Sequence, residues 1–215
     1  MIFYANGMQA EHVEFDAGGT RRFPTEVICV VLGGRVNDAH APAVLTGNDF
    51  YCARGSVALF VSCLEGHTIE AAKHELPVVK QEVRELQRLM SEKPQFDGFR
   101  TTHYFAGNLY ARSVWRPADV LVIGGLHKHE HLSVLLSGTM HIGSMIHAPH
   151  VFVTAPSTKR GTYSYTDAEF LTIHRLPTRT RDLDAIERQL IDSENDSPRL
   201  YDADNRLKPI EVSLQ

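Results

Sequence analysis

The sequence predicts a mainly β protein built around an antiparallel sandwich or barrel. Between residues 99 and 176, apolar runs rich in β-branched and aromatic residues alternate with turn signals, at the spacing of about 8–12 residues typical of such folds. Two similar runs, Glu26–Leu32 and Val57–Val61, lie near the N-terminus and end close to glycines. Helical periodicity is confined to two short segments, which we expect to be a linker helix and a C-terminal helix.

The chain divides into four expected regions. Residues 1–66 form a β-rich N-terminal segment of unassigned role, and residues 67–97 a linker helix region. Residues 98–177 form the barrel, and residues 178–215 a C-terminal helix and tail. A length of 215 residues and an apolar content of 43% suffice to bury a core without disulfides or metals.

The barrel region contains six expected strands, and both helices have an apolar face. The strands are Tyr110–Trp115, Val120–Ile123, His131–Leu136, Val151–Thr154, Thr162–Tyr165 and Glu169–His174. In the linker helix, apolar residues recur at helical spacing after Pro77: Val79, Val83, Leu86 and Met90. This face can pack on the protein itself or bind a partner. The C-terminal helix spans residues 181–191 and places Leu183, Ile186 and Leu190 on one side.

Charge and cysteine usage restrict the location and the partners. The formal net charge of −4 gives no overall attraction to a nucleic-acid polymer or to a membrane surface. No apolar run reaches membrane-spanning length, and the first residues lack the pattern of a signal peptide. The three cysteines have no CxxC spacing, which fits a reducing compartment. We therefore expect a soluble, cytoplasmic protein.

The most informative stretch is GGLHKHEHLSVLLSG, residues 124–138. In an extended strand His127, His129 and His131 would project from one face, because alternate side chains point the same way. Neutral imidazoles are common ligands of transition metals, so the pattern predicts a site for Fe, Mn, Ni or Zn. The alternative is a solvated, histidine-rich loop. The apolar run that follows favours the metal site, since it must enter a core and carry His131 with it.

This stretch resembles the first motif of the cupin family: a glycine followed by HxH, three or four residues, a glutamate, six residues and a glycine. Aligned on Gly138, His131 takes the position of the glutamate and His127 that of the second histidine. Gly125 falls where the first histidine is expected, and His129 is an additional histidine. The chain thus departs from the motif while keeping residues that bind metals.

The second cupin motif, PxGxxH, resembles APSTKR at residues 155–160. Ser157 replaces the glycine and Arg160 the histidine. An arginine stays protonated and cannot ligate a metal, but it can hold a carboxylate or a phosphate by two hydrogen bonds. His174, at the end of the expected strand Glu169–His174, is a candidate further ligand from a neighbouring strand, with a histidine bonded to a backbone group as the alternative.

More narrowly, residues 77–191 are similar to small cupin proteins encoded by tailed phages and prophages. The similarity is carried by HYFAGNLYAR, HKHEHLSVLLSG, APHVFVTAPSTKR, FLTIH and DLDAIERQLI, in this order. It implies a cupin-type jelly-roll barrel able to bind a metal, a homo-oligomer, and a location in the host cytoplasm. Residues 1–66 lie outside it.

Three kinds of function fit these residues. A metal-dependent enzyme of unassigned reaction would bind its small-molecule substrate at the histidines, with Glu130, Tyr163 or Tyr165 as candidate acids or bases. A binding protein without turnover would instead use Lys159, Arg160 and the two tyrosines for an anionic, nucleotide-like signal of host defence. A structural or assembly role is the third.

Overall fold

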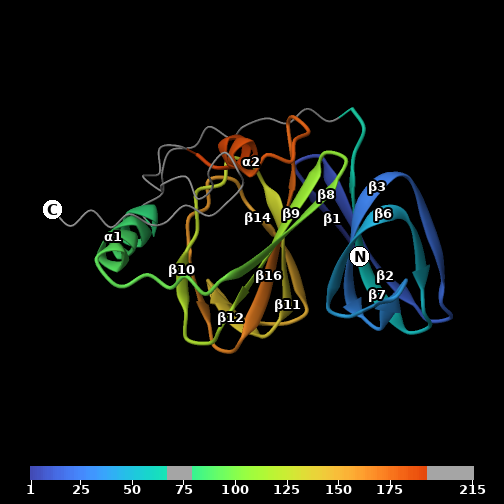
Figure 1. Ribbon diagram of the computed structural model, residues 1–215, viewed down its shortest axis with the longest axis horizontal. Helices are drawn as coiled ribbons and strands as arrows, with labels where there is room; N and C mark the ends of the chain where they lie inside the picture. The colour runs from blue at the N-terminus through green and yellow to red at the C-terminus, as the bar shows by residue number, and fades with distance from the viewer. Residues whose placement is uncertain (67–78, 193–215) are drawn as a thin grey trace.

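The computed structural model of the chain describes residues 1–66 and 79–192 and is mainly β, with three antiparallel sheets (Figure 1). The predicted fold class, an antiparallel β architecture with a linker helix, a C-terminal helix and a β-rich N-terminal segment, is confirmed. Neither helix of the described part is long and apolar enough to cross a membrane.

The N-terminal segment forms a seven-stranded sheet. Its strands, in spatial order, are β1 (Ile2–Ala5), β2 (Met8–Phe15), β7 (Ser56–Cys63), β3 (Gly19–Gly33), β6 (Ala43–Cys52), β4 (Arg35–Val36) and β5 (Ala39–His40). The two predicted runs lie within β3 and β7. In β3, the run is continuously apolar because both of its faces are buried: Ile28 and Val30 contact one core, and Cys29 and Val31 another.

A five-stranded sheet follows in the second half of the chain. Its spatial order is β14 (His150–Thr154), β11 (His131–Ser137), β16 (Ala168–Arg175), β9 (Leu109–Arg116) and β8 (Arg100–Ala106). The remaining strands form a four-stranded sheet, β10 (Leu121–Ile123), β15 (Gly161–Ser164), β12 (Thr139–Ile142) and β13 (Ser144–His147).

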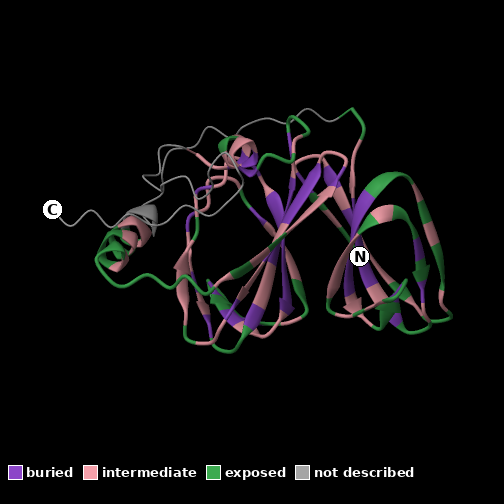
Figure 2. Ribbon diagram, in the orientation of Figure 1, coloured by how far each residue is buried: buried purple, intermediate pink, exposed green. Residues whose placement is uncertain are grey.

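The five-stranded sheet is the central layer of the molecule, and its buried strands lie between the other two sheets (Figure 2). On one face, Leu132, Val134 and Leu171 share a core with Ile28 and Leu59 of the N-terminal sheet. On the other face, Leu135 and Phe170 of the same sheet contact apolar residues of the four-stranded sheet, which are Met140, Ile142 and Ile146. The five-stranded and the four-stranded sheets face each other and enclose the barrel interior. The N-terminal sheet covers the outside of the barrel.

The two helices lie in different parts of the molecule. Helix α2 (Leu183–Leu190) buries Leu183, Ile186 and Leu190, as its periodicity predicts, and packs on Leu176 and Tyr110. Helix α1 (Val79–Ser91) lies at the end of the molecule away from the N-terminal sheet (Figure 1). Pro77, the expected first-turn residue, lies outside the described residues.

Candidate metal centre

Three histidines converge at one end of the barrel interior. One ring nitrogen each of His127, His131 and His174 lies within 4.8 Å of the others. The ring centroids are 4.4 Å apart for His127 and His131, 4.5 Å for His131 and His174, and 4.9 Å for His127 and His174. Three imidazoles this close form a ligand set suited to a divalent transition metal.

Strand pairing brings His131 and His174 together. Strands β11 and β16 are antiparallel neighbours, and Leu132 lies opposite Ile173. His131 precedes Leu132 and His174 follows Ile173, so the two imidazoles come next in the register, on the opposite face of the sheet. Leu132 and Ile173 face the core shared with the N-terminal sheet, and the histidines therefore face the barrel interior.

His127 reaches the same place by a different route from the one expected. The sequence suggested a single strand through residues 127–131, but β11 begins at His131. His127 instead forms an isolated antiparallel bridge with Ile191, just after helix α2, and its carbonyl accepts a hydrogen bond of 2.7 Å from the Ser157 backbone. The end of the C-terminal helix therefore positions the first histidine.

Burial keeps the three imidazoles neutral. It lowers the pKa of His131 to about 4 and the pKa values of His127 and His174 well below the ordinary value, because a charged ring would lose its hydration. The neighbouring histidines and Arg112 lower the pKa values of His127 and His174 further. Neutral imidazole is the form that ligates a metal, so at neutral pH these rings need not lose a proton first.

The hydrogen bonds of the rings also fit a metal. Nδ1 of His131 is 3.3 Å from the backbone carbonyl of His129, which can accept a hydrogen bond from the Nδ1–H group and so leave Nε2 free to bind an ion. Nδ1 of His127 is buried without a hydrogen-bond partner. An unpaired buried nitrogen is costly unless a ligand satisfies it, and a metal ion would do so.

The other predicted metal ligand, His129, is buried but lies outside this group of three. Its backbone carbonyl faces His131, as described above. Glu130, a candidate acid or base, is instead bound to the N-terminal segment: its Oε2 accepts a hydrogen bond of 3.2 Å from the Asn6 backbone.

The residues expected to bind an anionic ligand lie on different faces. The guanidinium carbon of Arg160 is 5.9 Å from the centre of the Phe152 ring, and its charge contributes to the low pKa values of His127 and His131. Lys159 is buried, which lowers the pKa of its ammonium group. Arg160 thus lies on the side of the histidines.

The two tyrosines lie on the outside of the barrel. In β15 the buried residues Thr162 and Ser164 face the interior, and Tyr163 projects from the opposite side. The Tyr163 hydroxyl donates a 2.7 Å hydrogen bond to Asp119, and Tyr165 packs edge-on against Tyr163 with 44% of its surface exposed.

Strand β9 adds residues to the site that the sequence reasoning did not single out. Tyr110 pairs with His174 in register, and its ring is stacked on the histidine at 6.4 Å. His103 lies 2.9 Å from the Tyr110 hydroxyl. Arg112 pairs with Thr172, two residues before His174. Alternation within the predicted strand Tyr110–Trp115 is the signal that could have put Tyr110 and Arg112 on one face, but only the pairing with β16 shows that this face is the inner one.

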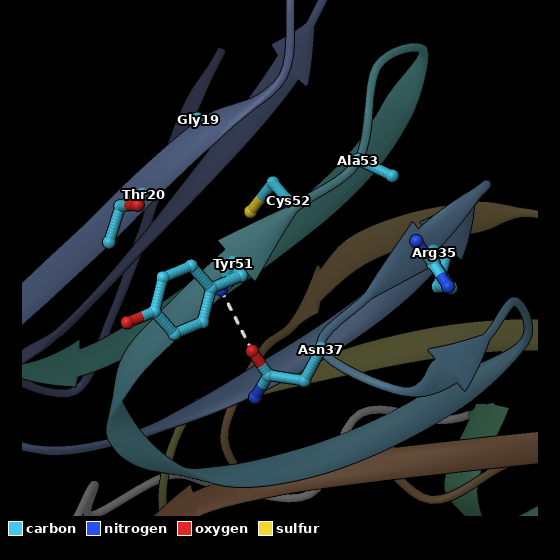
Figure 3. A pocket seen from close by; sticks show the side chains of 7 residues that line it. All are labelled: Gly19, Thr20, Arg35, Asn37, Tyr51, Cys52 and Ala53. Carbon is cyan, nitrogen blue, oxygen red and sulfur yellow. Dashed lines mark hydrogen bonds between the residues drawn. The ribbon is translucent and has the colours of Figure 1, made fainter.

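A separate pocket of about 340 Å³ lies in the N-terminal sheet (Figure 3). Among the seven residues that line it, Arg35 has the only charged side chain. The Asn37 side chain accepts a 2.8 Å hydrogen bond from the Tyr51 backbone, and burial raises the pKa of the Cys52 thiol. Because a raised pKa disfavours the thiolate, this pocket offers no activated nucleophile.

Comparison with known proteins shows similarity at the level of structure only. No protein-family model matches the chain, and no curated protein matches its sequence. Salicylate 1,2-dioxygenase of Pseudoaminobacter salicylatoxidans, in its adduct with gentisate, is similar with a TM-score of 0.48 and 10% identity, over 79% of this chain and 68% of that one.

Two further solved structures are similar to the chain. Oxalate decarboxylase of Bacillus subtilis, studied for its Mn(II) centres, has a TM-score of 0.47 and 7% identity, over 81% of this chain and 70% of that one. AerE of Microcystis aeruginosa has a TM-score of 0.45 and 11% identity, over 81% and 90% of the two chains.

Proposed function

We propose that the protein is a cupin-type metalloprotein that holds a divalent transition metal at His127, His131 and His174 and binds a small molecule beside it. The observation that carries the proposal is the convergence of three imidazoles: those of His131 and His174 are buried, and that of His127 is half-buried with a buried, unpaired Nδ1. Fe, Mn, Ni and Zn all accept such a ligand set, with positions left open for substrate.

An ion held by these three histidines would supply Lewis-acid chemistry, that is, polarisation of an oxygen donor or a lower pKa of a bound water. The protein's contribution is to hold the imidazoles neutral and oriented. Burial keeps the rings neutral, and the contact between Nδ1 of His131 and the His129 carbonyl orients the His131 ring. Tyr110, stacked on His174, restricts the orientation of that ring. These features support a metal-dependent enzyme over a structural role.

Binding without turnover is the second candidate, and the position of Arg160 favours it. A fixed cation beside the histidines suits an anionic ligand whether or not it reacts. A nucleotide-like signal of host defence is one such anion; it is suggested by Arg160 in the position of a ligand histidine and favoured by the phage-type resemblance. The homo-oligomer and the cytoplasmic location stay predictions. Light scattering of the purified protein tests the first of these, the oligomeric state.

Elemental analysis tests the metal centre. The protein is stripped with a chelator, loaded in turn with Fe(II), Mn(II), Ni(II) and Zn(II) without oxygen, and freed of unbound metal. We expect about one ion per chain in the wild type, and loss of that ion in His131→Ala and His174→Ala. His141→Ala is the matched control, because His141 is an exposed histidine of β12. Circular dichroism verifies that each variant is folded.

Two results would overturn the proposal. One is a wild-type protein that retains none of the four ions. The other is equal retention by the wild type and by the folded His131→Ala and His174→Ala variants, which would place the metal elsewhere.

A further inference from the structure

The interior of the barrel contains two cations beside the histidines. Arg112 projects from β9 on the face shared with His174, since it pairs with Thr172, and its charge lowers the pKa values of all three histidines. Arg160 enters from the loop before β15 and lies against Phe152, which pairs with Ser133 of β11. Both guanidiniums thus lie near enough to the candidate metal centre for their charges to act on its histidines.

These two cations have no counter-ion among the described residues. The structure gives neither Arg112 nor Arg160 an ion pair or a side-chain hydrogen bond there. The positions that share this inner face along the five strands are aromatic, aliphatic, hydroxyl, imidazole or guanidinium groups, and none is a carboxylate. They are Thr101, His103, Phe105, Tyr110, Arg112, Val114, Arg116, His131, Ser133, Leu135, His150, Phe152, Thr154, Ala168, Phe170, Thr172 and His174; Arg116, at the far end of this face, donates a hydrogen bond to the Thr162 hydroxyl. A partly buried charge is costly without a partner, so an anionic ligand would stabilise these two guanidiniums.

An unpaired hydroxyl lies in the same row of the sheet. Oγ1 of Thr172 is buried without a hydrogen-bond partner, and Thr172 is only 8% exposed. It sits between Arg112 on β9 and Ser133 on β11. The Ser133 hydroxyl is already paired with Thr154 at 2.8 Å. Buried hydroxyls are normally satisfied by protein, water or ligand, and this one is adjacent to the unpaired guanidinium.

The neighbouring residues restrict the size of what can bind. One step further along the sheet, the inner face becomes apolar with Val114, Leu135 and Phe170. Leu135 and Phe170 belong to the core that joins the two sheets of the barrel. The polar region therefore extends from the histidines over little more than one row of side chains.

We propose that Arg112 and Arg160, with the Thr172 hydroxyl, bind the carboxylate of a small organic acid inside the barrel, and that a second oxygen of this acid serves as a donor to the ion at the histidines. A guanidinium holds a carboxylate through two parallel N–H···O bonds, which are stronger than neutral hydrogen bonds. Only the role of the second oxygen rests on the proposed metal centre; the carboxylate site stands on the arginines and Thr172.

Isothermal titration calorimetry tests the inference on the full chain, both metal-loaded and metal-free. The probes are glycolate and oxalate, which carry a carboxylate and an adjacent oxygen donor, and inorganic phosphate. We expect the two acids to bind more tightly than phosphate, and more tightly with metal than without. Arg112→Gln and Arg160→Gln should each weaken acid binding by roughly 10- to 100-fold, the effect of losing charge-assisted hydrogen bonds.

Metal content and stability of the variants exclude indirect effects. Both variants should keep the wild-type metal stoichiometry, because neither arginine is a ligand, and their melting temperatures should not fall, since an unpaired charge is removed. Arg100→Gln is the matched control: Arg100 is exposed, its guanidinium lies 3.9 Å from the centre of the Trp115 ring, and the change should leave acid binding unaltered.

The outcomes separate this inference from the proposed function. Acid affinity that is unchanged in both glutamine variants, or binding of phosphate in preference to both acids, would overturn the carboxylate site while leaving the metal centre intact. A wild-type protein that takes up no metal but binds the acids through both arginines would overturn the metal centre and the role of the second oxygen, while supporting the carboxylate site.

Discussion

Lowering the pH from about 7 to 5 is expected to destabilise the metal-free protein, because the histidine cluster is buried in its neutral form. An unfolded chain protonates its histidines near the ordinary pKa of about 6.5. In the folded protein, burial lowers the pKa of His131 to about 4 and those of His127 and His174 well below 6.5. In this range the unfolded state binds more protons, so stability is fully present above about pH 6.5 and is lost as the pH falls toward 4.

The magnitude can be worked out for His131. With an unfolded pKa of about 6.5 and a folded pKa of about 4, protonation of the unfolded state costs about 2 kcal/mol of folding free energy between pH 7 and 5. His127 and His174 act in the same direction. The stability of a whole domain is only about 5–15 kcal/mol, so the loss should be plainly measurable.

Urea unfolding of chelator-treated protein, followed by circular dichroism at pH 7, 6 and 5, measures this dependence. His131→Asn should reduce the loss between pH 7 and 5 by about 2 kcal/mol, because it removes one buried titrating ring. The exposed His141→Asn is the control and should behave like the wild type. The reasoning would be refuted by a metal-free protein with equal stability at pH 7 and 5, or by a folded His131→Asn variant that keeps the full loss.

Two further predictions concern the folding of the chain. Leu132→Ala should lower the free energy of unfolding in urea by about 2–5 kcal/mol, because Leu132 is fully buried in the core between the N-terminal sheet and the barrel. Leu89→Ala is the control, since Leu89 is exposed. An equal effect of the two changes would contradict the shared core. Gly138→Ala should lower the melting temperature measured by calorimetry, since φ at Gly138 is +87° and an added Cβ would collide with the Asp167 backbone oxygen. Gly107→Ala is the control: φ at Gly107 is also positive, but no atom lies near the added Cβ, so the melting temperature should fall less. A larger fall for Gly107→Ala than for Gly138→Ala would contradict the clash.

Several elements could be predicted from the sequence because their signals are local. The alternation of apolar runs and turns indicated the β architecture, and the spacing of Leu183, Ile186 and Leu190 identified the buried face of α2. His131 could be placed at the start of a buried strand because the apolar run after it had to enter a core. Such patterns depend only on the period of a strand or a helix, which neighbouring residues along the chain reveal.

Other features depend on which strands pair, and the periodicity of the sequence does not predict this pairing. His174 joins His131 through the register of β11 and β16, and Arg112 joins the site through the pairing of β9 with β16. His127 is positioned by Ile191, which lies beyond the C-terminal helix. Strand alternation assigns a residue to a face, but only the packing of sheets decides whether that face is inside.

The sequence by itself therefore determined that the protein is an antiparallel β fold with a concentration of histidines ahead of a buried strand. The tertiary structure decided which of those histidines meet and which cations lie beside them. It also showed that residues 1–66 form a sheet that covers the outside of the barrel and packs on the five-stranded sheet through a common apolar core. The physical reason is that local periodicity follows from backbone geometry, whereas the site is made by contacts between strands far apart in the chain.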